Sequence, residues 1–84
     1  MRVHVKLFAI LRDRAGTGEL SLHLHDGETV GGAVSALAQQ HTSMADFLPR
    51  VAYAVNREYV NASTILHDGD ELALIPPVSG GLDA

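Results

Sequence analysis

The sequence predicts an α+β domain in which one main helix packs across a mixed sheet of four to five strands. Three observations support this fold class. Apolar residues alternate with polar ones in two segments near the start, one later stretch has helical spacing, and two or three short apolar segments follow it. Such a sheet buries its apolar face under a helix, which gives two layers around one core.

The first two strands are predicted from their period of two. Through residues 2–9, side chains alternate so that Leu7 faces the core and Phe8 faces outward. Through residues 19–25, leucines alternate with polar residues in the same way. The intervening segment 12–18 is charged and contains glycine, which indicates a turn. The two strands are therefore expected to form an antiparallel hairpin.

The main helix is predicted to begin after a break at residues 26–28, with Thr29 as its N-cap. Apolar residues then recur at helical spacing as far as Ala38. Gly31 and Gly32 in the first turn each cost about 1 kcal/mol relative to alanine. A close approach of the helix to the sheet would explain their presence.

The second half of the chain is predicted to complete the sheet. Residues 42–49 are expected to be irregular, strands are expected at 51–55 and 71–75, and a turn at 56–60 leads into a short strand. The first and last strands are expected to lie side by side at the centre. The predicted core consists of inward-facing apolar residues: Val5, Leu7, Leu22, Val34, Leu37, Leu72 and Leu74.

Composition limits the classes of function. The 84 residues suffice for one small domain, and a hydrophobic fraction of 46% is enough for a core. The net charge of −4 and the scattered basic residues argue against nucleic-acid binding. No apolar run reaches membrane-spanning length, and no signal peptide precedes the first strand, so a cytoplasmic protein is expected. The absence of cysteine excludes disulfides, thiolate metal sites and a cysteine nucleophile.

No metal centre or catalytic cluster is predicted. His4, His23 and His25 could share the outer face of the first hairpin, but no carboxylate is placed beside them, and solvated histidines are common on strands. The acidic turn 67–71 lacks the spacing of a calcium loop. With no Ser-His-Asp grouping and no phosphate-binding loop, the chain is not expected to be an enzyme alone, nor to hold a cofactor tightly.

The most informative segment is residues 75–81, Ile-Pro-Pro-Val-Ser-Gly-Gly. The two prolines cannot donate to a sheet, so the chain must leave the fold there. The two glycines have no side chains and can pass through a narrow channel. We therefore divide the chain into a domain of residues 1–77 and a flexible tail of residues 78–84. Such a tail suits a protein whose working group is its own C-terminus, delivered into another protein's active site.

Three stretches together have a recognisable pattern. They are residues 7–12 (Leu-Phe-Ala-Ile-Leu-Arg), residues 54–60 (Ala-Val-Asn-Arg-Glu-Tyr-Val) and residues 66–81. The last of them, with an Asp-Gly-Asp-Glu turn, an apolar strand, two prolines and a diglycine, is specific. With these stretches the chain resembles, from end to end, the small subunit of molybdopterin synthase, the MoaD type of ubiquitin-like sulfur carrier. The resemblance implies a β-grasp fold.

The resemblance also implies a chemistry centred on Gly81, with Gly80 beside it. In this family, an adenylyltransferase related to the ubiquitin activators uses ATP to adenylate the terminal glycine carboxylate, which then becomes a thiocarboxylate. The tail enters the large subunit of molybdopterin synthase and supplies sulfur for the dithiolene of molybdopterin. A thiocarboxylate is a strong nucleophile at neutral pH, which explains how a protein without cysteine can carry sulfur.

The chain departs from this family where Gly81 is joined to Leu82 by an amide, which offers no carboxylate to adenylate. Three explanations stay open. A processing protease removes residues 82–84, or these residues are left over from an expression vector or a fusion, or the carrier function is lost and the domain only binds a partner. Two further alternatives are a carrier for thiamine thiazole or cysteine synthesis and a modifier that forms isopeptide bonds to lysines.

A partner-binding surface is predicted at the root of the tail. Phe8 and Ile75 both face outward on strands expected to be neighbours, and an exposed apolar pair of this kind is typical of an interface. Tyr59 is expected to join them. With the residues that the resemblance adds, the predicted partner-binding set is Phe8, Arg12, Tyr59, Ile75, Pro76, Pro77 and Val78.

Overall fold

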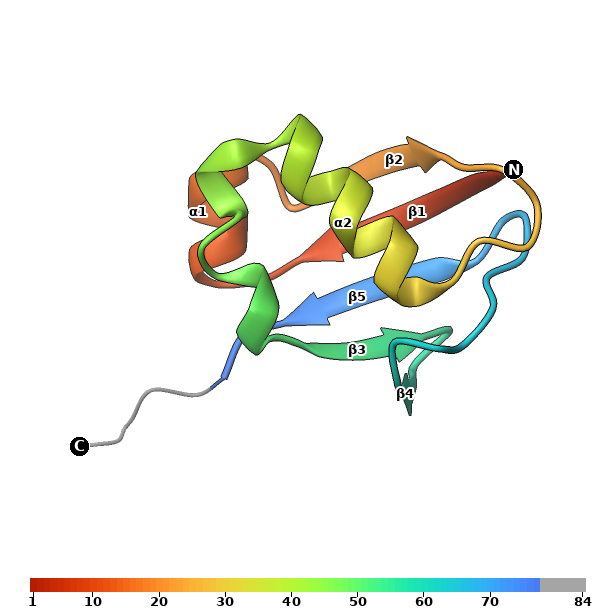
Figure 1. The fold of residues 1–84 in the computed structure, drawn as a ribbon. Helices are drawn as coiled ribbons and strands as arrows, with labels where there is room; N and C mark the ends of the chain where they lie inside the picture. Colours follow the sequence, from red (N-terminus) through yellow and green to blue (C-terminus); the bar gives the residue numbers. More distant parts are fainter. Residues whose placement is uncertain (78–84) are drawn as a thin grey trace.

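The structure is a computed structural model that describes residues 1–77, so the predicted tail from Val78 onward lies outside the described residues. It contains a five-stranded mixed sheet with one main helix across one face (Figure 1), which confirms the predicted fold class. Its elements, in chain order, are β1 (Arg2–Leu7), α1 (Ile10–Ala15), β2 (Glu19–His23), α2 (Val30–Gln40), the 3₁₀ helices η1 (Thr42–Met44) and η2 (Leu48–Arg50), β3 (Ala52–Val55), β4 (Glu58–Val60) and β5 (Glu71–Ile75).

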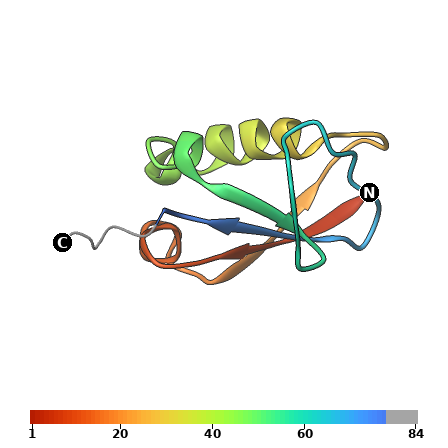
Figure 2. The same ribbon diagram turned by 90° about the horizontal axis from the view of Figure 1, so that it is seen from below.

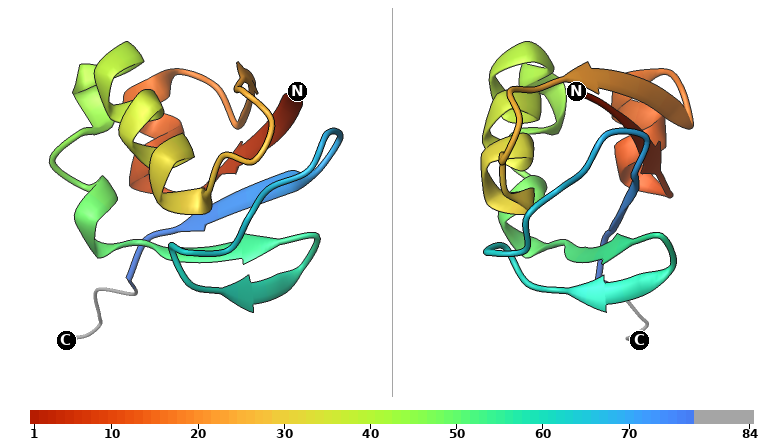
Figure 3. Two further views of the ribbon diagram at one scale, coloured as in Figure 1. Left: turned by 45° about the vertical axis from the view of Figure 1, so that its right-hand side comes forward. Right: turned by 90° about the vertical axis from the view of Figure 1, so that its right-hand side faces the viewer.

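The strands lie in the order β2-β1-β5-β3-β4. The first and last strands pair in parallel at the centre, as predicted, with Lys6 opposite Ala73. The predicted β1–β2 hairpin is antiparallel, and β3 and β4 form a second hairpin at the far edge of the sheet (Figure 3). Helix α2 lies over one face of this sheet (Figure 2), so the side chains on the opposite face are available for other contacts.

The hydrophobic core lies between α2 and the sheet. All the predicted core residues are buried except Val34, which is only partly buried. The buried stripe of α2 follows Val30, Ala33 and Leu37, and Val34 lies at the margin of this stripe. Further buried residues, which the sequence pattern does not indicate, come from η1 (Met44), η2 (Leu48) and the segment before β5 (Leu66).

The prediction of a turn at residues 12–18 is wrong, because most of this segment lies in the short helix α1. Leu11 is completely buried, and this burial outweighs the charges on the exposed side of the helix. Gly16, with φ of 77°, ends the helix, and its N–H donates to the carbonyl of Arg12 at 2.9 Å. The first strand also ends sooner than predicted, before Ala9, whose φ is 51°.

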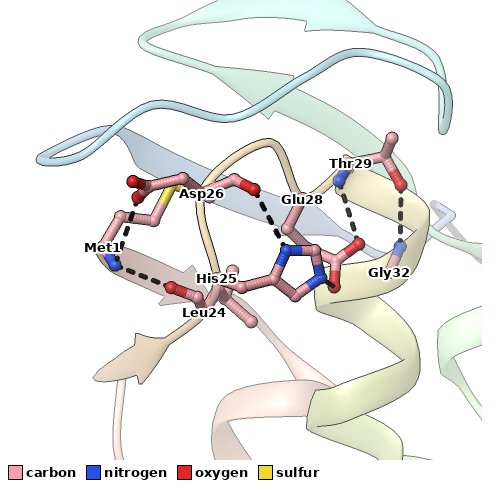
Figure 4. Close-up of polar contacts among 7 residues, drawn as sticks. All are labelled: Met1, Leu24, His25, Asp26, Glu28, Thr29 and Gly32. Carbon is pink, nitrogen blue, oxygen red and sulfur yellow. Dashed lines mark hydrogen bonds and ion pairs between the residues drawn. The ribbon is translucent and has the colours of Figure 1, made fainter.

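The start of α2 confirms the predicted N-cap (Figure 4). The Thr29 Oγ1 accepts a hydrogen bond from the N–H of Gly32 at 3.1 Å. The Glu28 carboxylate accepts from the N–H of Thr29 at 3.1 Å and lies 3.0 Å from His25 Nε2. An N-cap of this kind typically contributes about 1 kcal/mol to stability.

The close approach that explains Gly31 involves the segment after β4 rather than the sheet. The N–H of Gly31 donates to the carbonyl of Ala62 at 2.9 Å. A Cβ atom at Gly31 would lie 3.3 Å from both this oxygen and the Ala62 side chain. Next to it, the N–H of Val30 donates to the carbonyl of Thr64. These contacts attach the first turn of α2 to the segment that leads into β5.

No helix within residues 1–77 is long and apolar enough to cross a membrane.

Candidate partner-binding site

The sheet face that points away from α2 has a hollow of about 510 Å³. Side chains alternate along a strand, and the residues of β5 that line the hollow alternate with the buried Leu72 and Leu74. The lining therefore belongs to the face without the main helix. Its residues come from β1 and the residue that follows it, from β3, β4 and β5, and from the β3–β4 turn: Lys6, Phe8, Ala54, Arg57, Tyr59, Glu71, Ala73 and Ile75.

The strand register explains why this face is hollow. Ala73 on β5 lies opposite Lys6 on one side and Ala54 on the other, and Ala54 lies opposite Tyr59. Two alanines on neighbouring strands thus occupy the middle of one row across the sheet. Their methyl groups form a low floor between larger side chains, because directly opposed residues have their Cβ atoms only about 5 Å apart.

The apolar lining of the hollow includes Phe8, Tyr59 and Ile75, the three residues predicted to form the apolar part of the partner-binding surface. Phe8 is 45% exposed and Tyr59 is 75% exposed. Ile75, also expected to be exposed to solvent, is instead partly buried. Because β5 is a central strand, its neighbours β1 and β3 cover part of this side chain. The three residues line one hollow, while their role in binding a partner stays a prediction.

The other end of the hollow is charged. The Nζ of Lys6 lies 3.8 Å from a carboxylate oxygen of Glu71, and both side chains are partly exposed, so the pair adds little stability. Within residues 1–77, no carboxylate lies at ion-pair distance from Arg57. The hollow therefore joins an apolar end to an end with a positively charged guanidinium.

Arg57 is held by the two-residue turn between β3 and β4. Both Asn56 and Arg57 have positive φ, 50° and 72°, as a tight hairpin turn of this type requires. The Asn56 amide fixes the turn against β5, since its Oδ1 accepts from the N–H of Glu71 at 3.1 Å and its Nδ2 donates to Asp70 at 3.0 Å.

The remaining predicted residues lie elsewhere. Pro76 and Pro77 line a second, smaller hollow of about 200 Å³ together with Ile10, Phe47 and Arg50. Arg12 is exposed on α1 and lines neither hollow. The other three, Val78, Gly80 and Gly81, lie outside the described residues.

Several residues of the site have no local signal in the sequence. The outward position of Ala73 followed from its place between Leu72 and Leu74, but its pairing with Ala54 depends on a register that the sequence does not specify. Arg57 was recognised only as part of a turn. The exposed Ile65 was also missed, and it lies outside the hollow. The described part of the chain contains no group of three or more histidine, aspartate or glutamate side chains that could hold a metal.

The model of the ThiS family matches residues 5–81. The chain belongs to the ThiS family. It is 36% identical over 81 residues to the molybdopterin synthase sulfur carrier subunit of Arabidopsis thaliana, with 96% of this chain and 84% of the relative covered. This finding confirms the resemblance seen in the sequence.

Solved structures agree with the β-grasp fold of this ThiS-family chain. The crystal structure of SAMP1 from Haloferax volcanii superimposes with a TM-score of 0.89 at 31% identity, covering 96% of this chain and all of that one (100%). A protein–protein complex of subunits 1 and 2 of the molybdopterin-converting factor from Helicobacter pylori contains a chain that matches with a TM-score of 0.71 at 27% identity. That match covers 96% of this chain and 100% of the other.

Proposed function

We propose that this ThiS-family protein is the sulfur carrier subunit of molybdopterin synthase. The relative from Arabidopsis thaliana has this name, and the matching chain from Helicobacter pylori is part of a complex of two subunits. The observation that carries the proposal is the place of the apolar hollow. Ile75 lines the hollow at the end of β5, and the diglycine follows shortly after it in the sequence. One side of the docking surface, at Ile75, thus lies on the same segment of the chain as the reactive end.

In the proposed reaction the carboxylate of Gly81 is the group that changes. A carboxylate oxygen attacks the α-phosphate of ATP in a separate adenylyltransferase, and pyrophosphate leaves. A donor of sulfide-level sulfur then attacks the acyl carbon and displaces AMP, which leaves a thiocarboxylate. In the large subunit this sulfur forms a bond to the pterin precursor, and water cleaves the acyl–sulfur bond, which returns Gly81 to a carboxylate. The carrier holds no cofactor tightly and catalyses no step alone, and ATP is consumed by the activating partner.

This chemistry requires an exposed carboxylate at Gly81, so residues 82–84 are removed by a processing protease before activation. The hollow docks each partner in turn through Phe8, Tyr59 and Ile75. In this proposal the stiff segment of Pro76, Pro77 and Val78 leads from the domain to the diglycine. Arg12, which is exposed on α1, contributes a further contact with the partner.

The Phe8→Ala variant is expected to bind the partners more weakly while its folding stability stays nearly the same. Phe8 is partly exposed, so its truncation should leave the free energy of unfolding nearly unchanged. Affinity for the large subunit should fall by more than about 1 kcal/mol, as for the anchor residue of an interface. Titration calorimetry with each partner measures this loss.

Ile65→Ala is the matched control, because Ile65 is 54% exposed but lies outside the hollow. It should bind both partners as the unmodified protein does. If the Phe8 variant binds both partners as tightly as the unmodified protein, or if it does not fold, Phe8 does not belong to the interface.

A second candidate function is protein modification, because the chain is also similar to SAMP1, which is described as a small archaeal modifier protein. The intact mass of the protein isolated from its native cells tests the proposed function against this alternative. A chain ending at Gly81 with one oxygen replaced by sulfur supports the carrier. Conjugates with lysines of other proteins, without any thiocarboxylate, would contradict it.

A further inference from the structure

The turn between β3 and β4 has an unusual residue at its second position. Asn56 and Arg57 both adopt left-handed backbone conformations, with φ of 50° and 72°. Asparagine tolerates this region, and glycine is the preferred residue after it in such a turn. An arginine carries a Cβ atom that is unfavourable there. Arg57 therefore lowers folding stability relative to glycine, and backbone strain of this kind is often kept for function.

The place of Arg57 indicates what that function is. It lines the charged end of the hollow, where Lys6 already has Glu71 as its partner at 3.8 Å. No carboxylate of residues 1–77 lies at ion-pair distance from Arg57. The hollow thus offers one positive charge without an opposite charge, on a chain whose net charge is −4. Arg57 and the two alanines of the floor line the same hollow.

We propose that Arg57 is a specificity-determining residue of the docking surface, and that it binds a carboxylate on the partner. The inference rests on the proposed function, in which the partner is the large subunit of molybdopterin synthase. A guanidinium binds a carboxylate through two parallel N–H···O bonds, which fix orientation as well as charge. The partner segment that fits combines this carboxylate with an apolar side chain placed over Ala54 and Ala73.

The size and the polarity of the hollow favour a protein segment as its occupant. About 510 Å³ of space above two methyl groups accommodates a large apolar side chain with its neighbours. The surrounding Phe8, Tyr59 and Ile75 supply apolar and aromatic contact area. Aromatic residues and arginine in one desolvated patch are typical of the energetic centre of an interface.

The Arg57→Gly variant tests the inference because it should move stability and affinity in opposite directions. Its midpoint of urea denaturation should stay the same or rise, since the turn becomes Asn-Gly. Its affinity for the purified large subunit should fall about tenfold, which equals about 1.4 kcal/mol. The salt dependence of binding should also become weaker, since a charge pair has been lost.

Arg2→Gln is the control for charge alone. Arg2 lies at the opposite end of β1 from Phe8, outside the hollow, and its substitution removes the same charge. Its affinity should match that of the unmodified protein. Ala73→Leu tests the floor, because the larger side chain fills the hollow while the core residues on the other face stay in place. It should weaken binding without unfolding the protein.

The outcomes separate the two proposals. If the unmodified chain ending at Gly81 does not bind the large subunit, the proposed function fails. If that chain binds and Arg57→Gly binds equally tightly, the role of Arg57 is overturned while the proposed function stands. A lower denaturation midpoint for Arg57→Gly would contradict the claim that the backbone of Arg57 is strained, on which the inference depends. Unchanged binding by Ala73→Leu would overturn the insertion of an apolar side chain.

Discussion

We expect the Leu74→Ala substitution to lower the free energy of unfolding by about 2–5 kcal/mol. Leu74 is completely buried in the central strand β5, opposite Leu7 on β1 and Tyr53 on β3. Its truncation leaves a cavity in the core. Residues on β1 and β3 cannot easily move to fill this cavity, because both strands are hydrogen-bonded to β5. Because small domains are stable by only about 5–15 kcal/mol, the loss is a large part of the total. Urea denaturation followed by circular dichroism measures it.

Ile75→Ala is the matched control on the same strand. Ile75 faces away from α2 and is only partly buried, so its truncation should cost much less. If Leu74→Ala lowered the free energy of unfolding by less than about 1 kcal/mol, the core position assigned to Leu74 would be wrong. A cavity in a well-packed core lowers stability by more than this.

The sheet could be predicted from the sequence where one face of each strand is buried. The sequence predicts the last strand at residues 71–75 with the correct inward residues, because apolar side chains alternate there between a turn and a proline. Thr29 was identified as an N-cap because the chemistry of capping is local. For both the last strand and the N-cap of α2, a few residues that are neighbours in the sequence determine the local structure.

The features that could not be predicted from the sequence depend on contacts between distant segments of the chain. Helix α1 is six residues long, too short for a periodic pattern, and it is stabilised by burial of Leu11 against the core. The floor of the hollow requires Ala54 to lie beside Ala73, and this pairing is set by the whole sheet rather than by either strand. The positive φ of Arg57 is likewise visible only in the folded hairpin.

The largest functional effect is expected from the peptide bond after Gly81. Under the proposed function, a chain that ends at Gly81 should support ATP–pyrophosphate exchange with the activating enzyme and yield a thiocarboxylate. A chain that retains residues 82–84 should do neither. Adenylation needs a carboxylate oxygen as the nucleophile, and the amide between Gly81 and Leu82 has only a weakly nucleophilic carbonyl. The rate of pyrophosphate exchange with purified components measures the difference.

One further variant and one binding measurement make this result specific to the terminal glycine. The Gly81→Ala variant of the shortened chain should be nearly inactive, because an added methyl group next to the reacting carbon disturbs the alignment that the reaction requires. The chain with residues 82–84 should still bind the activating enzyme through the hollow around Phe8, so its inactivity would reflect lost chemistry rather than lost docking. Exchange by that longer chain at the rate of the shortened one, with its mass unchanged, would disprove activation at Gly81.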